Sequence, residues 1–170
     1  MKEWGVIRVA DSRDFARILA LNLESEHFLS PMDEQRLRYL DRHAGYHRVM
    51  VGDGEVVAFL LALREGLDSE SPNYRWFAGR YPSFLYVDRV VVAASHQGRR
   101  LGVALYDDLF AYAKQAGVSR VACEFDVEPA NQASRRFHER YGFSEVGTQW
   151  VADGAKRLSL QVRAVESASI

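Results

Sequence analysis

The feature that most constrains the fold is a strongly apolar segment that runs through a short polar turn directly into a helix. Residues 84–92 are rich in β-branched side chains and predict a buried strand. Leu101, Leu105 and Leu109 then recur at every fourth position until Gly117 ends the pattern, which indicates an amphipathic helix. Such a unit belongs in a sheet on which helices pack.

The turn within this unit has the composition of an anion-binding loop. The first N–H groups of a helix have no intrahelical acceptor and carry about half a positive charge. Gly98 and Gly102 permit close approach to the backbone, Gln97 adds a donor, and Arg99 and Arg100 add positive charge. The turn favours a diphosphate group. Nucleotides, dinucleotides and coenzyme A all carry such a group, so the turn alone leaves all three open. The common nucleotide loops, GxGxxG and GxxxxGK[ST], are absent from the chain.

Residues 97–102 resemble the pyrophosphate loop of the GNAT superfamily of N-acetyltransferases, whose pattern is [QR]-x-x-G-x-[GA] after a central strand. The first glycine of that pattern is replaced by Arg100, whose side chain must then point away from the loop or bind a cofactor phosphate. A second segment, residues 131–143, independently resembles the helix and turn N-x-x-[AS]-x-x-[LF]-[YH]-x-[KR]-x-G-F of the same family. The two motifs lie in the family's order, and the resemblance extends over residues 4–165.

The resemblance implies acetyl-CoA as a cosubstrate. No metal is expected, because the histidines share no ligand spacing and the chain has only one cysteine. The cofactor-binding residues that the resemblance implies are Val90, Val91, Val92, Gln97, Gly98, Arg99, Arg100, Leu101, Gly102, Val103, Ala104, Asn131, Ser134 and Phe137. In this family a backbone N–H of the central strand usually holds the thioester carbonyl, which would place that donor within residues 90–92.

The family commonly uses a tyrosine to protonate the leaving thiolate, and this chain has His138 at that position. A histidine of ordinary pKa, about 6.5, could protonate a thiolate whose conjugate acid has a pKa near 8.5. Alternatively, His138 only hydrogen-bonds or lines the cofactor channel, and Tyr141 is the acid. Tyr141 and the two residues after it also fit a helix end followed by a core phenylalanine.

Three carboxylates are candidates for relaying the amine proton. Period-two alternation places Asp88 on the face of its strand that carries Tyr86. Glu124 and Asp126 alternate in the same way on the next strand. Asp88 could equally pair with Arg89 at a strand end and have no chemical role.

The remaining segments predict an α/β (α+β) single domain over residues 1–170, with a mixed, mostly antiparallel sheet of about six or seven strands and about four helices. Hairpins are expected around Gly52-Asp53-Gly54 and Asp153-Gly154. Residues 66–82 show no helical or strand period and predict a long loop, either a substrate-side element or a surface loop. The apolar positions that indicate the first helix are Phe15, Ile18, Leu19 and Leu23.

Composition limits the kinds of partner and the location that can be expected for the protein. The 22 basic and 23 acidic side chains nearly cancel, which argues against a nucleic-acid partner. The longest apolar run, residues 56–63, is too short to span a membrane, and no export signal is visible, so a cytoplasmic protein is expected. The single cysteine, Cys123, lies in a predicted buried strand, and the histidines have no metal-ligand spacing.

These observations predict an N-acetyltransferase that moves an acetyl group to a primary amine of a small molecule or peptide by direct attack in a ternary complex. A homodimer is expected because paired subunits are frequent in the resembled family. One alternative is a non-catalytic acyl-CoA sensor or interaction module. Another is an acyltransferase for a longer acyl-CoA such as succinyl-CoA, for which Arg99, Arg100, Arg135 and Arg136 offer carboxylate partners.

Overall fold

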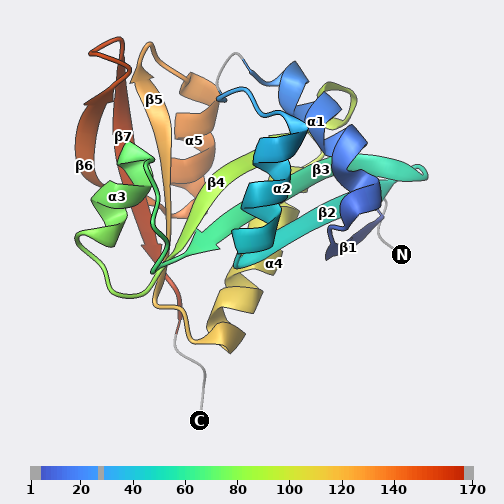
Figure 1. Ribbon diagram of the computed structural model, residues 1–170, viewed down its shortest axis with the longest axis horizontal. Helices are drawn as coiled ribbons and strands as arrows, with labels where there is room; N and C mark the ends of the chain where they lie inside the picture. The colour runs from blue at the N-terminus through green and yellow to red at the C-terminus, as the bar shows by residue number, and fades with distance from the viewer. Residues whose placement is uncertain (1–4, 27–28, 167–170) are drawn as a thin grey trace. The chain divides into compact units, whose positions relative to one another are not determined.

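The computed structural model describes residues 5–26 and 29–166 and shows an α/β fold (Figure 1). The strands and α-helices are β1 (Val6–Val9), α1 (Phe15–Glu24), α2 (Glu34–His43), β2 (Tyr46–Gly52), β3 (Glu55–Arg64), α3 (Pro72–Ala78), β4 (Leu85–Val92), α4 (Leu101–Ala116), β5 (Arg120–Glu128), α5 (Gln132–Tyr141), β6 (Ser144–Val151) and β7 (Lys156–Ala164). The strands form a seven-stranded sheet in the order β1-β2-β3-β4-β5-β7-β6. The predicted fold class, with its mixed sheet, is confirmed.

The chain divides into two compact units, which are described separately. The first unit runs to Leu63 and includes Val87–Leu109, and the second includes Arg64–Tyr86 and the residues from Phe110 onward. That residues 1–170 act as one N-acetyltransferase domain stays a prediction.

The first unit is built on the predicted hairpin of β2 and β3, which is confirmed. β1 and β3 pair antiparallel with β2, and the turn between β2 and β3 contains Asp53 with a φ of 54°. Tyr46 and His47 are consecutive on β2, so their side chains point to opposite faces of the sheet. His47 contacts Asp41 of α2, whereas Tyr46 donates to Asp108 of α4 at 2.6 Å. The unit therefore has α2 on one face and the first part of α4 on the other (Figure 1).

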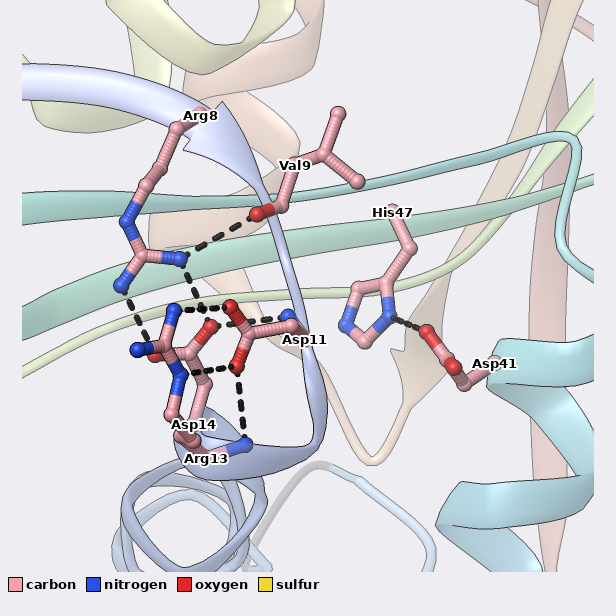
Figure 2. A network of polar contacts seen from close by, with 7 residues as sticks. All are labelled: Arg8, Val9, Asp11, Arg13, Asp14, Asp41 and His47. Carbon is pink, nitrogen blue, oxygen red and sulfur yellow. Dashed lines mark hydrogen bonds and ion pairs between the residues drawn. The ribbon is translucent and has the colours of Figure 1, made fainter.

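Polar contacts around the end of β1 fix the start of α1 (Figure 2). The side chain of Asp11 caps the 3₁₀ turn Ser12–Asp14 and accepts from the backbone N–H of Arg13 at 2.9 Å. The guanidinium of Arg8 donates to both carboxylate oxygens of Asp14, at 2.8 and 2.9 Å. Asp11 thus caps the 3₁₀ turn that leads into α1, whereas α1 itself has Asp14 at its N-cap with no side-chain cap bond, so the expected cap of the helix is displaced by one turn.

One expected apolar position of α1 is wrong. The helix itself is present, but Leu23 is 66% exposed, whereas Leu21 and Asn22 are fully buried. Asn22 accepts a hydrogen bond from the buried guanidinium of Arg89, so the buried side of α1 at this turn carries a polar residue, and Leu23 lies on the exposed side.

The long loop predicted over residues 66–82 contains a helix instead, α3. Ser71 caps it by accepting from the N–H of Tyr74 at 3.3 Å, and Pro72 occupies its first turn, where no N–H is needed. Tyr74 and Phe77, three residues apart, are buried on one face. The helix has only two turns, so the sequence shows too few repeats for its period to stand out.

The second unit contains the antiparallel strands β5, β7 and β6, and β4 pairs parallel with β5 at Leu85 and Tyr86. The predicted C-terminal β pair is confirmed. Glu124 and Phe125 are consecutive on β5 and point to opposite faces. Glu124 accepts a hydrogen bond from α3, and the ring of Phe125 lies 5.7 Å from that of His138 on α5. These two helices therefore cover opposite faces of the β5–β7–β6 sheet. Cys123 is buried, as predicted.

Candidate active site

The candidate diphosphate loop lies in the first unit, between the end of β4 and the start of α4. The strand is anchored at its end by a hydrogen bond from the N–H of Ala93 to the carbonyl of Val57 at 2.8 Å. A 3₁₀ turn, Ala94–His96, follows. Gly98 has a φ of 83° and Arg100 a φ of 62°. These left-handed residues reverse the chain so that α4 begins at once.

Arg100 adopts the backbone conformation that a glycine adopts most easily. A φ of 62° in a residue with a Cβ costs about 1 to 2 kcal/mol relative to the right-handed region. The family's pattern has glycine at this position, and the backbone here keeps glycine-like geometry in spite of the arginine. The Arg100 side chain is exposed, so it reaches solvent beside the first turn of α4.

The donors at this turn suit a diphosphate. The first intrahelical bond of α4 runs from the N–H of Ala104 to the carbonyl of Arg100 at 3.1 Å. The N–H groups of Leu101, Gly102 and Val103 thus precede the helical ladder and point outward at its positive end. Arg99 is exposed, as is Arg100, and both can add charge-assisted bonds. Leu101 is buried and anchors the turn.

Gln97 makes a different contact from the one expected. Its side-chain amide donates to the carbonyl of Val92 at 3.3 Å and so closes the turn on the end of β4. Its role as a donor to the ligand stays a prediction.

Contacts from the β2–β3 turn and from α1 hold this turn in place, and the sequence did not reveal them. His96 is 3.1 Å from Asp53 through its Nε2 atom and 2.8 Å from the hydroxyl of Ser95 through Nδ1. The N–H of Ala94 donates to Glu24 of α1 at 3.2 Å. Asp53 belongs to the β2–β3 turn, so the loop is tied both to that hairpin and to α1.

Asp88 occupies β4 in the first unit, with its side chain 13% exposed. The predicted alternation is confirmed for this unit, because Asp88, Val90 and Val92 are partly exposed whereas Arg89 and Val91 are buried. The predicted alternative contact is also present, since the Nε of Arg89 donates to Asp88 Oδ2 at 2.8 Å. The partial exposure of Val90 and Val92 marks one side of the strand as accessible.

The other two carboxylate candidates lie on β5 of the second unit. Glu124 accepts from the hydroxyl of Tyr86 and from the amide of Asn73 on α3 at 3.0 Å. Asp126 is buried, and this burial raises the pKa of its carboxyl even though Lys156, 3.8 Å away, acts to lower it. Glu124 is therefore held by hydrogen bonds from neutral groups, whereas Asp126 is buried and paired with Lys156.

His138 lies buried on α5 in the second unit. Its Nδ1 is 2.7 Å from the backbone carbonyl of Ser134, an arrangement in which Nδ1–H donates to the carbonyl. Burial lowers the pKa of His138, and the bond to Ser134 offsets this only in part. The neutral ring with its proton on Nδ1 has a lone pair, not a proton, on Nε2. This geometry favours the hydrogen-bonding alternative over proton donation.

Tyr141 ends α5 inside an aromatic cluster of the second unit. Its ring stacks with that of Phe137 at 6.0 Å and lies 5.6 Å from that of Phe110. Arg163 covers the rings of Tyr141 and Phe110, each at 4.7 Å, and donates to the carbonyl of Tyr141 at 2.9 Å. Gly142 follows with a φ of 106°, which is the expected helix end.

Asn131 and Ser134 form the start of α5. The side chain of Asn131 caps the helix by accepting from the N–H of Ser134 at 3.2 Å. Both residues are partly exposed, as is Phe137 one turn later. The structure thus brings the second-motif residues together on one helix of the second unit, and the loop residues together in the first.

Within residues 5–26 and 29–166, no group of three or more His, Cys, Asp or Glu side chains could hold a metal ion. In the same residues, no helix is both long enough and apolar enough to cross a bilayer.

Comparison with known proteins agrees with this geometry. Residues 12–143 match the model of the acetyltransferase (GNAT) family. The fold is similar to that of Ard1 from Thermoplasma volcanium, at 17% identity and a TM-score of 0.78 over 96% of this chain and 99% of that one. It is also similar to the Escherichia coli ribosomal-protein-S18-alanine N-acetyltransferase, at 16% identity and a TM-score of 0.71 over 96% of each chain.

A third similar structure, yncA from Salmonella typhimurium, contains its cofactor acetyl-CoA. It is 21% identical, with a TM-score of 0.72 over 97% of this chain and 96% of that one. No curated protein sequence matches the chain.

The α/β fold, in which a central strand leads through a glycine-containing turn into a helix, is shared with these acetyltransferase structures. The family model covers more than half of the sequence, and the chain belongs to the acetyltransferase (GNAT) family.

Proposed function

We propose that the protein transfers the acetyl group of acetyl-CoA to a primary amine of a small molecule or peptide, by direct attack within a ternary complex. The observation that carries the proposal is the turn at residues 97–102, where left-handed Gly98 and Arg100 directly precede α4 and the first N–H groups of the helix come before its ladder of hydrogen bonds. The diphosphate of coenzyme A is the ligand of this family that such a turn accepts.

The transfer makes a C–N bond and breaks a C–S bond. The acceptor ammonium first loses a proton, and its nitrogen lone pair attacks the thioester carbonyl. The tetrahedral intermediate then expels the thiolate, the nitrogen loses a second proton, and the thiolate gains one to leave as coenzyme A. Each step gains from holding the two substrates in fixed positions.

Residue roles follow from the contacts within each unit. Asp88 is the base candidate that we favour, because it lies beside the accessible valines of β4, where a backbone N–H would polarise the carbonyl. For the acid we favour Tyr141 over His138. A phenol keeps its proton at neutral pH, whereas His138 directs its only proton to Ser134.

Thiol release from acetyl-CoA tests the proposal directly. The panel of acceptors is spermidine, L-phenylalanine and a short peptide that begins with alanine, since a relative of this fold is an alanine N-acetyltransferase. We expect amine-dependent thiol release with at least one of them. No release at all would contradict the enzyme and favour a non-catalytic acyl-CoA-binding module, and release that does not depend on any amine would contradict transfer to an amine.

The same proposal places the protein in the cytoplasm, as a single domain over residues 1–170 that forms homodimers. Light scattering on the purified protein tests the subunit number. Replacing acetyl-CoA with succinyl-CoA tests the acyl chain, and faster release from succinyl-CoA would favour the longer acyl group.

A further inference from the structure

The buried arginine of β4 joins three parts of the first unit. Arg89 is 6% exposed. Its Nη1 donates to the side-chain oxygen of Asn22 in α1 at 2.9 Å and to the carbonyl of Ser30 at 3.1 Å. The amide of Asn22 donates to the same carbonyl at 3.3 Å. Since Ser30 precedes α2, this one guanidinium ties β4, α1 and the segment before α2 together.

The same guanidinium orients Asp88. Consecutive strand residues point to opposite faces, yet the Nε of Arg89 reaches Asp88 Oδ2 at 2.8 Å. The contact uses one carboxylate oxygen through one N–H group. Among the described residues of the first unit, nothing donates a hydrogen bond to Asp88 Oδ1. The carboxylate is therefore fixed in direction, with one oxygen left for another donor.

Stability alone does not explain why an ion pair is buried here. A buried ion pair loses the hydration of both charges, and apolar side chains of similar volume often stabilise a core equally well. Arg89 also cannot lose its charge on burial. What the ion pair supplies that apolar residues could not is a fixed orientation of Asp88 and of the Ser30 carbonyl.

We propose that Arg89 is a positioning residue for the acceptor amine: it directs Asp88 Oδ1 toward the ammonium and holds the segment at Ser30 beside it. The inference rests on the proposed function, since it assigns Asp88 to the amine. A primary ammonium has three N–H donors, and a carboxylate oxygen and nearby backbone carbonyls can accept hydrogen bonds from them. One ammonium proton passes to Oδ1 first, and the nitrogen lone pair that this frees then attacks the thioester carbonyl.

Steady-state thiol release with Arg89→Lys, Asp88→Asn and the double variant tests this inference. The acceptor is spermidine or the alanine peptide, whichever the wild type acetylates. Lysine keeps the charge but lacks the fork that contacts three partners at once. We expect Arg89→Lys to lower kcat/KM for the amine by about tenfold or more, the effect of one charge-assisted hydrogen bond. The KM for acetyl-CoA should stay within about twofold, because α4 and its turn are untouched.

The double variant separates positioning from general support of the fold. If Arg89 acts through Asp88, Arg89→Lys should change the amine kcat/KM by less than about twofold in the Asp88→Asn background. The control is Arg17→Lys, which alters a partly exposed arginine of this unit that also donates to a backbone carbonyl, that of Val56 at 2.9 Å. It should leave both KM values within about twofold of wild type.

Equal losses in both backgrounds, or a rise in the KM for acetyl-CoA as large as that for the amine, would overturn the positioning role. Should Arg89→Lys not fold, Asn22→Ala provides the second test. It keeps the pair of Arg89 and Asp88 but removes one anchor, and a raised amine KM is expected. Unchanged amine kinetics in Asn22→Ala would overturn the proposal. A wild type that acetylates no amine refutes the proposed function itself, and the wild-type assay alone reveals this.

Discussion

Among single residues, Arg100 is expected to lower the free energy of unfolding and to strengthen the binding of acetyl-CoA. Arg100→Gly removes a left-handed residue that costs about 1 to 2 kcal/mol, offset by about 0.5 to 1 kcal/mol from the greater freedom of glycine in the unfolded chain. We expect the free energy of unfolding in urea to rise by about 0.5 to 1 kcal/mol. Binding of acetyl-CoA should weaken about tenfold if the exposed guanidinium contacts a phosphate. A less stable Arg100→Gly protein would contradict the cost assigned to this backbone.

Gly147 on β6 leaves room for one aromatic ring. A Cβ at this position would lie 2.4 Å from Cζ2 of Trp76, which is closer than atoms can approach. We expect Gly147→Ala to lower the free energy of unfolding by about 1 to 3 kcal/mol, the cost of overpacking. Gly79→Ala is the matched control, since its nearest atom would be 3.5 Å away, and its change should be within about 0.5 kcal/mol. Equal losses in the two variants would contradict the close packing of α3 on β6.

The site residues differ in how far the sequence could predict them. Residues 97–102 were found because a loop that contacts a diphosphate needs glycines, donors and charge in a short segment. The contacts of Arg89 with Asn22 and Ser30 could not be found in this way. These partners lie far apart in the chain, and only the packing of α1 on β4 brings them together. The sequence also could not predict which ring nitrogen of His138 carries the proton, because this depends on the backbone carbonyl of Ser134 one helical turn earlier.

At the scale of elements, α3 owes its start to one hydroxyl. Ser71→Ala removes the cap that accepts from Tyr74 and should lower the free energy of unfolding by about 1 kcal/mol. The control is Ser119→Ala, an exposed serine that makes its hydrogen bonds through the backbone. Urea unfolding followed by tryptophan fluorescence measures both, because Trp76 lies in α3. A Ser71→Ala protein as stable as the control would show that tertiary packing alone holds this helix.

Long elements with a full period were predicted well, and short ones were not. The strand β4 and the helices α4 and α5 lie within a few residues of their expected positions, and the two expected hairpins are present as β2–β3 and β6–β7. The helix α3 was missed because Pro72, Asn73 and Gly79 are turn formers in most contexts. Here Pro72 begins the helix and Tyr74 and Phe77 are buried beneath it, so tertiary packing outweighed local preference.

For the molecule as a whole, two buried histidines make stability depend on pH. Burial lowers the pKa values of His47 and His138 below their ordinary values, so protons bind the unfolded chain more readily. Their contribution is fully present above the unfolded pKa of about 6.5 and is lost as the pH falls through the folded pKa values. His47 adds a second cost, because its buried Nε2 has no hydrogen-bond partner in the described structure and could not share a new proton.

The free energy of unfolding should therefore fall between pH 7.5 and pH 5.5, by at most about 1.4 kcal/mol for each histidine. Urea titrations at both pH values measure it for the wild type and for the double variant His47→Gln, His138→Gln. We expect the variant to lose less than half as much, since neither glutamine titrates. Asp41 next to His47 and Asp14 nearby would limit the effect by attracting the proton. A wild type as stable at pH 5.5 as at pH 7.5 would contradict the neutral, buried state of both rings.

Calorimetry with acetyl-CoA tests most directly whether the turn at residues 97–102 binds the cofactor. Gly102→Glu places a negative side chain in the first turn of α4, where a carboxylate suits the helix dipole and should not unfold the protein. Ala111→Glu adds the same charge at an exposed position later in α4 and is the control. We expect binding in the wild type and in Ala111→Glu, and none in Gly102→Glu. Equal binding by all three proteins would place the cofactor elsewhere, and no binding by the wild type would contradict the account.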